Sequence, residues 1–151
     1  MRDRVRAPIR PVGGHEVSSM TDEEFMAAVR AGDEPGGHVA NLRLTWLLLR
    51  DRPDDVEDEL AAALATRAGR TGGTVHQTRT AAWLALVRVA MAAVPTACEL
   101  EDLLRQRPEL LDRNLLHRYY EPLTLADPMA SVIVVVPDRA PLPGWPVPVA
   151  G

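Results

Sequence analysis

Two segments of the chain are apolar at almost every position, and the rest of the pattern is arranged around them. Residues 38–50 place Leu and Trp on nearly all sides of a helix, and residues 81–94 are apolar apart from Arg88. A helix that is apolar all round is usually buried, because a surface helix keeps one polar face. We therefore expect two buried central helices, one over residues 38–50 and one that follows Thr74 and ends near residue 93.

Shorter or amphipathic segments surround these two and predict the other helices. Their apolar positions recur with a helical period, or they follow a start signal such as a capping box or a proline in the first turn. The expected helices cover residues 21–32, 54–69, 96–106, 108–120 and 123–130. Capping boxes are expected at Thr21-x-x-Glu24, Thr74-x-x-Gln77 and Thr96-x-x-Glu99.

Together these segments predict an all-α, single-domain bundle of about five to seven helices. The helical domain is expected over residues 19–136, with a flexible N-terminal arm at 1–18 and an extended, Pro-rich C-terminal tail at 137–151. Val132–Val136 has the composition of a strand but finds no second strand in this chain. It is therefore expected to lie extended over the bundle or to pair with a second copy in a homodimer.

Composition and charge narrow the classes of function. A net charge of −4 with a pI near 5.5 argues against a nucleic-acid partner, which normally meets a basic face. No apolar run approaches the roughly twenty residues of a membrane span, and no secretory signal is apparent, so we expect a cytoplasmic protein. All 17 basic residues are Arg, which excludes a lysine Schiff base. Cys98 is the only cysteine, which excludes an internal disulfide.

A repeated motif marks the start of each central helix. A Gly-Gly pair precedes His38, a second Gly-Gly pair precedes His76, and Trp46 and Trp83 follow within each helix. Short loops join antiparallel neighbours, so both histidines are expected at one end of the bundle. If helix lengths match, the segment 117–120, with Tyr119 and Tyr120, reaches the same end.

Polar residues form a stripe behind each histidine. His38, Asn41 and Thr45 are spaced by three and four residues, as are His76 and Thr80. Buried polar groups need partners, because an unpaired one costs roughly 1–3 kcal/mol. The stripes therefore either line a common functional pocket or serve structure, by capping helices and bonding to one another.

The motifs His38-x-x-Asn41-x-Arg43-x-x-Trp46 and His76-x-Thr78-x-Thr80-x-x-Trp83, followed by Tyr119-Tyr120 and Val136-Pro137-Asp138, resemble a family of small, largely uncharacterised bacterial helical proteins. That family's pattern runs Phe-x-His-x-x-His-x-Arg-x-Ala-Trp, then Tyr-His-x-Thr-x-Thr. The resemblance covers residues 36–139 and implies a site at these positions without implying a reaction.

The chain departs from the family pattern where a metal would be held. Asn41 stands at the place of the second histidine, Gly36 at that of the aromatic residue, and Val75 at that of the tyrosine. The family pattern suits a three-histidine metal site, whereas zinc here would have only His38 and His76 as strong ligands. We therefore expect no metal and no other cofactor, with a two-histidine metal-binding protein as an alternative.

The preferred functional hypothesis is a small-molecule-binding enzyme that uses acid–base chemistry for isomerisation, cyclisation, dehydration or hydrolysis, with a place in bacterial specialised metabolism. The expected catalytic residues are His38, His76, Tyr119 and Tyr120, because imidazole exchanges protons near neutral pH and phenols donate to oxyanions. The expected substrate-binding residues are Asn41, Arg43, Thr45, Trp46, Thr80 and Trp83. The alternative is a non-catalytic helical module that binds a protein partner through residues 132–151, with Arg43 paired to an acid on the helix over residues 54–69.

Overall fold

The computed structural model describes residues 20–34 and 36–145, and within those ranges it is all-α with no strand. The N-terminal arm predicted for residues 1–18 lies outside the described residues. Seven α-helices and three short 3₁₀ helices make up the described part, which confirms the predicted fold class. They are α2 Asp22–Ala31, α3 His38–Asp51, η1 Pro53–Asp55, α4 Val56–Thr71, α5 Gln77–Ala93, α6 Leu100–Gln106, η2 Pro108–Leu111, η3 Leu115–Arg118, α7 Pro122–Ala126 and α8 Pro128–Val132.

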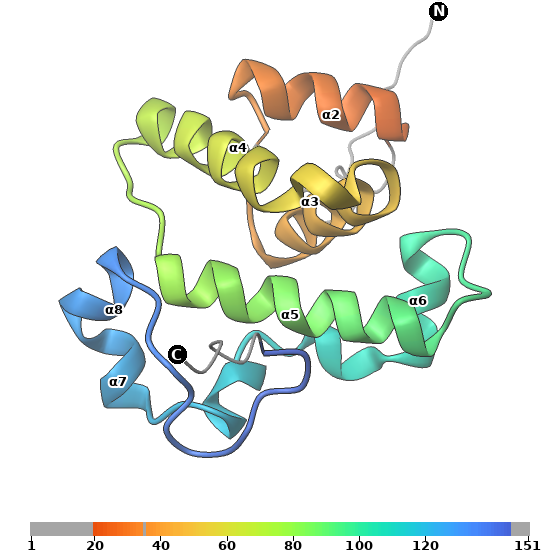
Figure 1. Cartoon of the computed structure of the whole chain (residues 1–151). Helices are drawn as coiled ribbons and strands as arrows, with labels where there is room; N and C mark the ends of the chain where they lie inside the picture. Colours follow the sequence, from red (N-terminus) through yellow and green to blue (C-terminus); the bar gives the residue numbers. More distant parts are fainter. Residues whose placement is uncertain (1–19, 35, 146–151) are drawn as a thin grey trace, which may run out of the picture.

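The two central helices are α3 and α5, as the apolar pattern predicts. α3 packs against both α4 and α5, and α5 also packs against α8 and η3. α5 therefore lies between a layer made by α2, α3 and α4 and a second layer made by the C-terminal helices (Figure 1). None of the described helices is long and apolar enough to cross a membrane.

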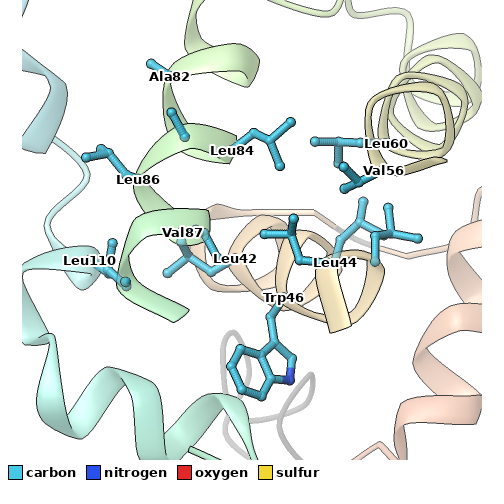
Figure 2. Packing of buried hydrophobic residues seen from close by; sticks show 14 of the residues in the cluster. Leu42, Leu44, Trp46, Val56, Leu60, Ala82, Leu84, Leu86, Val87 and Leu110 are labelled. Carbon is cyan, nitrogen blue, oxygen red and sulfur yellow. The ribbon is translucent and has the colours of Figure 1, made fainter. Parts of the chain in front are cut away.

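The core follows from the side chains that these helices bury. Leu42, Leu44 and Val87 meet where α3 crosses α5, and Leu84 points from α5 toward Leu60 of α4 (Figure 2). Leu86 points to the other side of α5, where the C-terminal layer covers it (Figure 2). Because both sides of α5 are covered, the all-round apolar pattern of its sequence is explained.

Two of the three predicted capping boxes are wrong in their position. Thr21 and Glu24 form the expected reciprocal pair at the start of α2. The N-cap of α5, however, is His76, whose ring accepts the N–H of Arg79, and not Thr74. The N-cap of α6 is Glu99, paired with Asp102, and not Thr96. In both cases a residue nearer the helix supplies the acceptor, so the helix begins later than predicted.

The continuous helix predicted over residues 108–120 is also wrong. The chain forms η2 and η3 instead, separated by Asp112, whose backbone is extended at φ −83° and ψ 110°. The side chain of Asp112 accepts the N–H of Asn114 at 2.9 Å, a local turn that competes with helical hydrogen bonding. The chain therefore does not run as one straight helix from residue 108 to residue 120.

The single helix predicted within residues 123–130 is replaced by two, α7 and α8. Asp127 separates them with an extended backbone, as expected for a residue that precedes a proline. Its side chain then accepts the N–H of Met129 and caps α8.

The segment after α8 is extended and packs on the bundle, as one of the two predicted alternatives had it. The hydroxyl of Tyr120 donates to the carbonyl of Val135 at 2.8 Å, and Arg139 N–H donates to the Tyr119 carbonyl. Burial, together with the charge of Asp138, raises the pKa of Tyr120 to about 12. The ring of Trp145 meets that of Tyr120 edge to face at 6.4 Å. The described part of the tail, residues 137–145, is thus held against the bundle.

Candidate functional site

A pocket of about 290 Å³ lies between the starts of α3 and α5 and the second half of α4. The two histidine-bearing helix starts border it from two sides, as the antiparallel arrangement predicts. Six of the ten residues predicted for the site line this pocket: His38, Asn41, Thr45, His76, Thr80 and Trp83. The other four, Arg43, Trp46, Tyr119 and Tyr120, do not line it.

The ring of His38 is fixed by one hydrogen bond and by one contact with an aromatic ring. Its Nε2 lies 2.7 Å from the carbonyl oxygen of Leu110 in η2. Since a carbonyl only accepts, Nε2 carries the hydrogen and Nδ1 carries the lone pair of the neutral ring. The ring also meets Trp83 edge to face, with 4.7 Å between centroids. Within the described residues, Nδ1 has no hydrogen-bond partner.

His76 is bound at both ring nitrogens. Its Nε2 donates to the carbonyl of Leu125 in α7 at 2.9 Å, and its Nδ1 accepts the N–H of Arg79 at 3.1 Å. The second bond makes His76 the N-cap of α5, which uses the Nδ1 lone pair. A metal bound by both histidines would therefore have to break the cap of α5. His76 therefore has a structural role, because it caps a helix, which is one of the two roles expected for the polar stripes.

Replacing His76 with Ala is expected to destabilise the fold by about 1–2 kcal/mol, because it removes the N-cap of α5 and the link to Leu125. His76→Asn is the matched variant, since Asn is a good N-cap that is too short to reach Leu125 in the same way. It should recover roughly half of the loss. Urea titrations at pH 7 measure both values, and equal stability of the Ala variant and the unmodified protein would contradict the structural role.

Asn41 is oriented by an arginine that was not predicted for the site. Arg67 of α4 lines the pocket and donates from NH2 to the Asn41 carboxamide oxygen at 2.7 Å. Its NH1 donates to Glu34, also at 2.7 Å, and the Glu34 side chain is only 4% exposed. A second oxygen of Glu34 accepts the N–H of Gly36 in a short bond. Glu34 and Arg67 are 33 positions apart, so no local pattern in the sequence connects them.

The two threonines of the stripes use their hydroxyl hydrogens within their own helices. Thr45 donates to the carbonyl of Asn41 and Thr80 to that of His76, each at 2.8 Å. Both hydroxyl oxygens keep lone pairs, so these side chains can only accept from a ligand while these bonds last. They contribute shape and acceptors to the pocket rather than donors.

Arg43 and Trp46 lie on another side of α3. Arg43 donates to the carbonyl of Met20 at 2.7 Å and to Asp22 at 2.9 Å, and its guanidinium lies over the ring of Phe25. Both residues border a second hollow of about 350 Å³ near α2 and α6. Arg43 does pair with an acid, but that acid is Asp22 of α2 and not one on the helix over residues 54–69.

Tyr119 and Tyr120 lie directly after η3, which packs against α5, and next to the tail. The straight helix predicted over residues 108–120 is broken between η2 and η3, and neither tyrosine lines the pocket. Two other parts of the C-terminal layer contact the pocket histidines instead: Leu110 of η2 contacts His38, and Leu125 of α7 contacts His76. Tyr120 is fully buried, and its hydroxyl already has a partner in Val135.

Comparison of the chain with protein-family models, with characterised proteins and with solved structures found no match. The described residues contain no group of three or more His, Cys, Asp or Glu side chains arranged to hold a metal ion. The pocket is therefore interpreted from its own geometry.

Proposed function

We propose that the protein is a small-molecule-binding enzyme that carries out acid–base chemistry in the pocket, with His38 as the group that takes and returns the proton. The observation that supports this is the hydrogen bond from His38 Nε2 to the Leu110 carbonyl. It holds one tautomer of the imidazole and leaves the Nδ1 lone pair for a ligand, which is what a general base requires.

The other pocket residues have supporting roles in this proposal. The Asn41 carboxamide oxygen is bound by Arg67, so its NH₂ group is the part left to donate to a ligand carbonyl. Trp83 supports the His38 ring and offers apolar surface. His76, with both nitrogens engaged, positions the start of α5 rather than transferring a proton. The reaction classes that fit are isomerisation, cyclisation, dehydration and hydrolysis, and none of them calls for a cofactor.

His38→Gln tests the role of the imidazole, because the Gln amide can still donate to the Leu110 carbonyl but cannot act as a base. Small carbonyl compounds that raise the melting temperature would first be selected, and their carbon-bound hydrogens followed by NMR in D₂O. The protein is expected to speed deuterium exchange, and His38→Gln to slow it by roughly a hundredfold or more while ligand binding persists. His117→Gln is the matched control, since His117 lies outside the pocket. Exchange that survives in His38→Gln, or that is lost equally in His117→Gln, would exclude His38 as the base.

A second candidate function is a non-catalytic protein-binding module. It is favoured by large apolar side chains that are exposed on α7, α8 and the following segment, namely Leu123, Met129, Val132, Ile133, Val134 and Val136. Under this alternative, sedimentation would reveal self-association or capture of a partner that Val132→Asp removes, and His38→Gln would leave that association unchanged.

A further inference from the structure

On the basis of the function proposed above, we infer that the ligand of the pocket is a small organic carboxylate with an apolar or aromatic body, and that Arg79 binds its carboxylate group. Arg79 follows His76 in the first turn of α5 and lines the pocket. The inference comes from the charges that surround the pocket and from the residues that form its walls.

The charged groups of the pocket leave one positive charge without a partner. The lining includes two arginines and two histidines but no Asp or Glu. Arg67 is neutralised by Glu34. Arg79 has no ion pair and no side-chain hydrogen bond within residues 20–34 and 36–145, although it is partly buried. The other arginines that lack a described ion pair or side-chain hydrogen bond, Arg30, Arg113 and Arg118, are exposed, where water satisfies them.

The backbone adds to this positive charge. The helices α3 and α5 both begin at the pocket, and neither carries an acidic residue in its first turn. The first turns of α2, α4 and α6, in contrast, all contain acidic residues. The N-cap of α3 is Gly37, which supplies no side-chain acceptor. Helix N-termini carry a partial positive charge, so an anion between these two starts is stabilised beyond its contact with Arg79.

The apolar walls define the rest of the ligand. The apolar residues that line the pocket come from α4, from the two central helices and from the segment before α5, namely Leu42, Leu60, Leu64, Val75 and Trp83. A volume of about 290 Å³ is at the lower end for ligand sites. One unpaired arginine balances one negative charge, which favours a monoanionic carboxylate over a dianionic phosphate. Arginine binds a carboxylate through two parallel hydrogen bonds.

The test compares four probes on the full chain by isothermal titration calorimetry at pH 7. They are 3-phenylpropionate, the neutral 3-phenylpropanamide, phenyl phosphate and acetate. We expect 3-phenylpropionate to bind more tightly than the other three, because it alone matches both the charge and the apolar walls. Arg79→Gln should weaken its binding roughly ten- to a hundredfold while leaving the amide unchanged. Arg113→Gln is the matched control, since it removes an exposed arginine outside the pocket, and it should change nothing.

The possible failures are distinguishable. If 3-phenylpropionate and the amide bind equally and Arg79→Gln has no effect, the carboxylate inference is overturned while the pocket remains a binding site. Tighter binding of phenyl phosphate overturns the choice of carboxylate. An equal loss of 3-phenylpropionate affinity in Arg113→Gln would mean that the net charge of the protein, and not Arg79 itself, determines binding. That result also overturns the inference. If none of the aromatic probes binds, the proposed small-molecule function fails with it. Circular dichroism of Arg79→Gln checks that its helices are intact.

Discussion

Arg67→Met is expected to lower the free energy of unfolding by about 3 kcal/mol. The substitution leaves the Glu34 carboxylate, whose side chain is 4% exposed, with the Gly36 N–H as its remaining described partner. Removing one member of a buried ion pair costs about 3–5 kcal/mol, because the charge that remains is neither solvated nor paired. The lower end of that range applies here, since the Arg67 side chain is 19% exposed and water reaches part of the pair.

The matched control is Arg88→Met. Arg88 pairs with Glu57 at 3.3 Å, but the two side chains are 44% and 65% exposed, so its loss should cost less than about 1 kcal/mol. Adding Glu34→Gln to Arg67→Met should recover about 1–2 kcal/mol, since a neutral amide keeps the bond to Gly36 without a buried charge. Urea unfolding at pH 7 measures all of these variants. If the Arg67 and Arg88 variants lose equal stability, the buried Glu34–Arg67 ion pair does not stabilise the fold more than an exposed pair does.

Thr78→Val is expected to lower the free energy of unfolding by about 2–3 kcal/mol. Thr78 is fully buried in α5, and its single hydroxyl hydrogen lies within reach of the carbonyls of Ala130 and Ile133, at 2.7 and 2.9 Å. Its oxygen accepts the N–H of Val135 at 3.1 Å. Valine keeps the shape of the side chain but leaves the buried Ala130 carbonyl and the part-buried groups of Ile133 and Val135 without this partner, and each buried group left unsatisfied costs roughly 1–3 kcal/mol.

Thr80→Val is the matched control on the same helix. The Thr80 hydroxyl donates to the His76 carbonyl, which already accepts the Thr80 N–H, so no group loses its last partner. Its loss should cost less than about 0.5 kcal/mol. Hydrogen exchange offers a second measurement, in which the Val135 amide should lose protection in Thr78→Val only. Unchanged protection of that amide would show that Thr78 does not hold the segment.

The central helices and their common end could be predicted because their signals are local. Apolar residues on all sides of residues 38–50 admit few explanations other than a buried helix. The glycine pairs before His38 and His76 mark the helix starts, and the short connections bring those starts together. His38, Asn41 and Trp83 accordingly line the pocket, as their positions on these helices predict.

The errors arose where tertiary contacts or turn chemistry decide the outcome. In the sequence, Arg67 is one of several charged residues on the polar side of an amphipathic helix. Its pairing with Glu34 depends on the tertiary fold, which brings these distant positions together. Arg79 gives no signal of a site in the sequence, since a charged residue in a helix is usually solvated. The break at Asp112 has a signal in the sequence, since Asp112 and Asn114 are turn-forming residues. Pro108 and the leucines that follow it, however, favour one continuous helix. A continuous helix would have carried the two tyrosines to the pocket, which neither of them lines.

The bonds from His38 to Leu110 and from His76 to Leu125 give the pocket a dependence on a remote part of the chain. Both carbonyls belong to the C-terminal layer. Thr78 of α5 also bonds to this layer, through the carbonyls of Ala130 and Ile133. Binding and the order of that layer are therefore thermodynamically linked: a ligand that favours the native histidine positions must also make residues 108–135 harder to unfold. Conversely, damage to the C-terminal layer should weaken ligand affinity even when every residue that touches the ligand is intact.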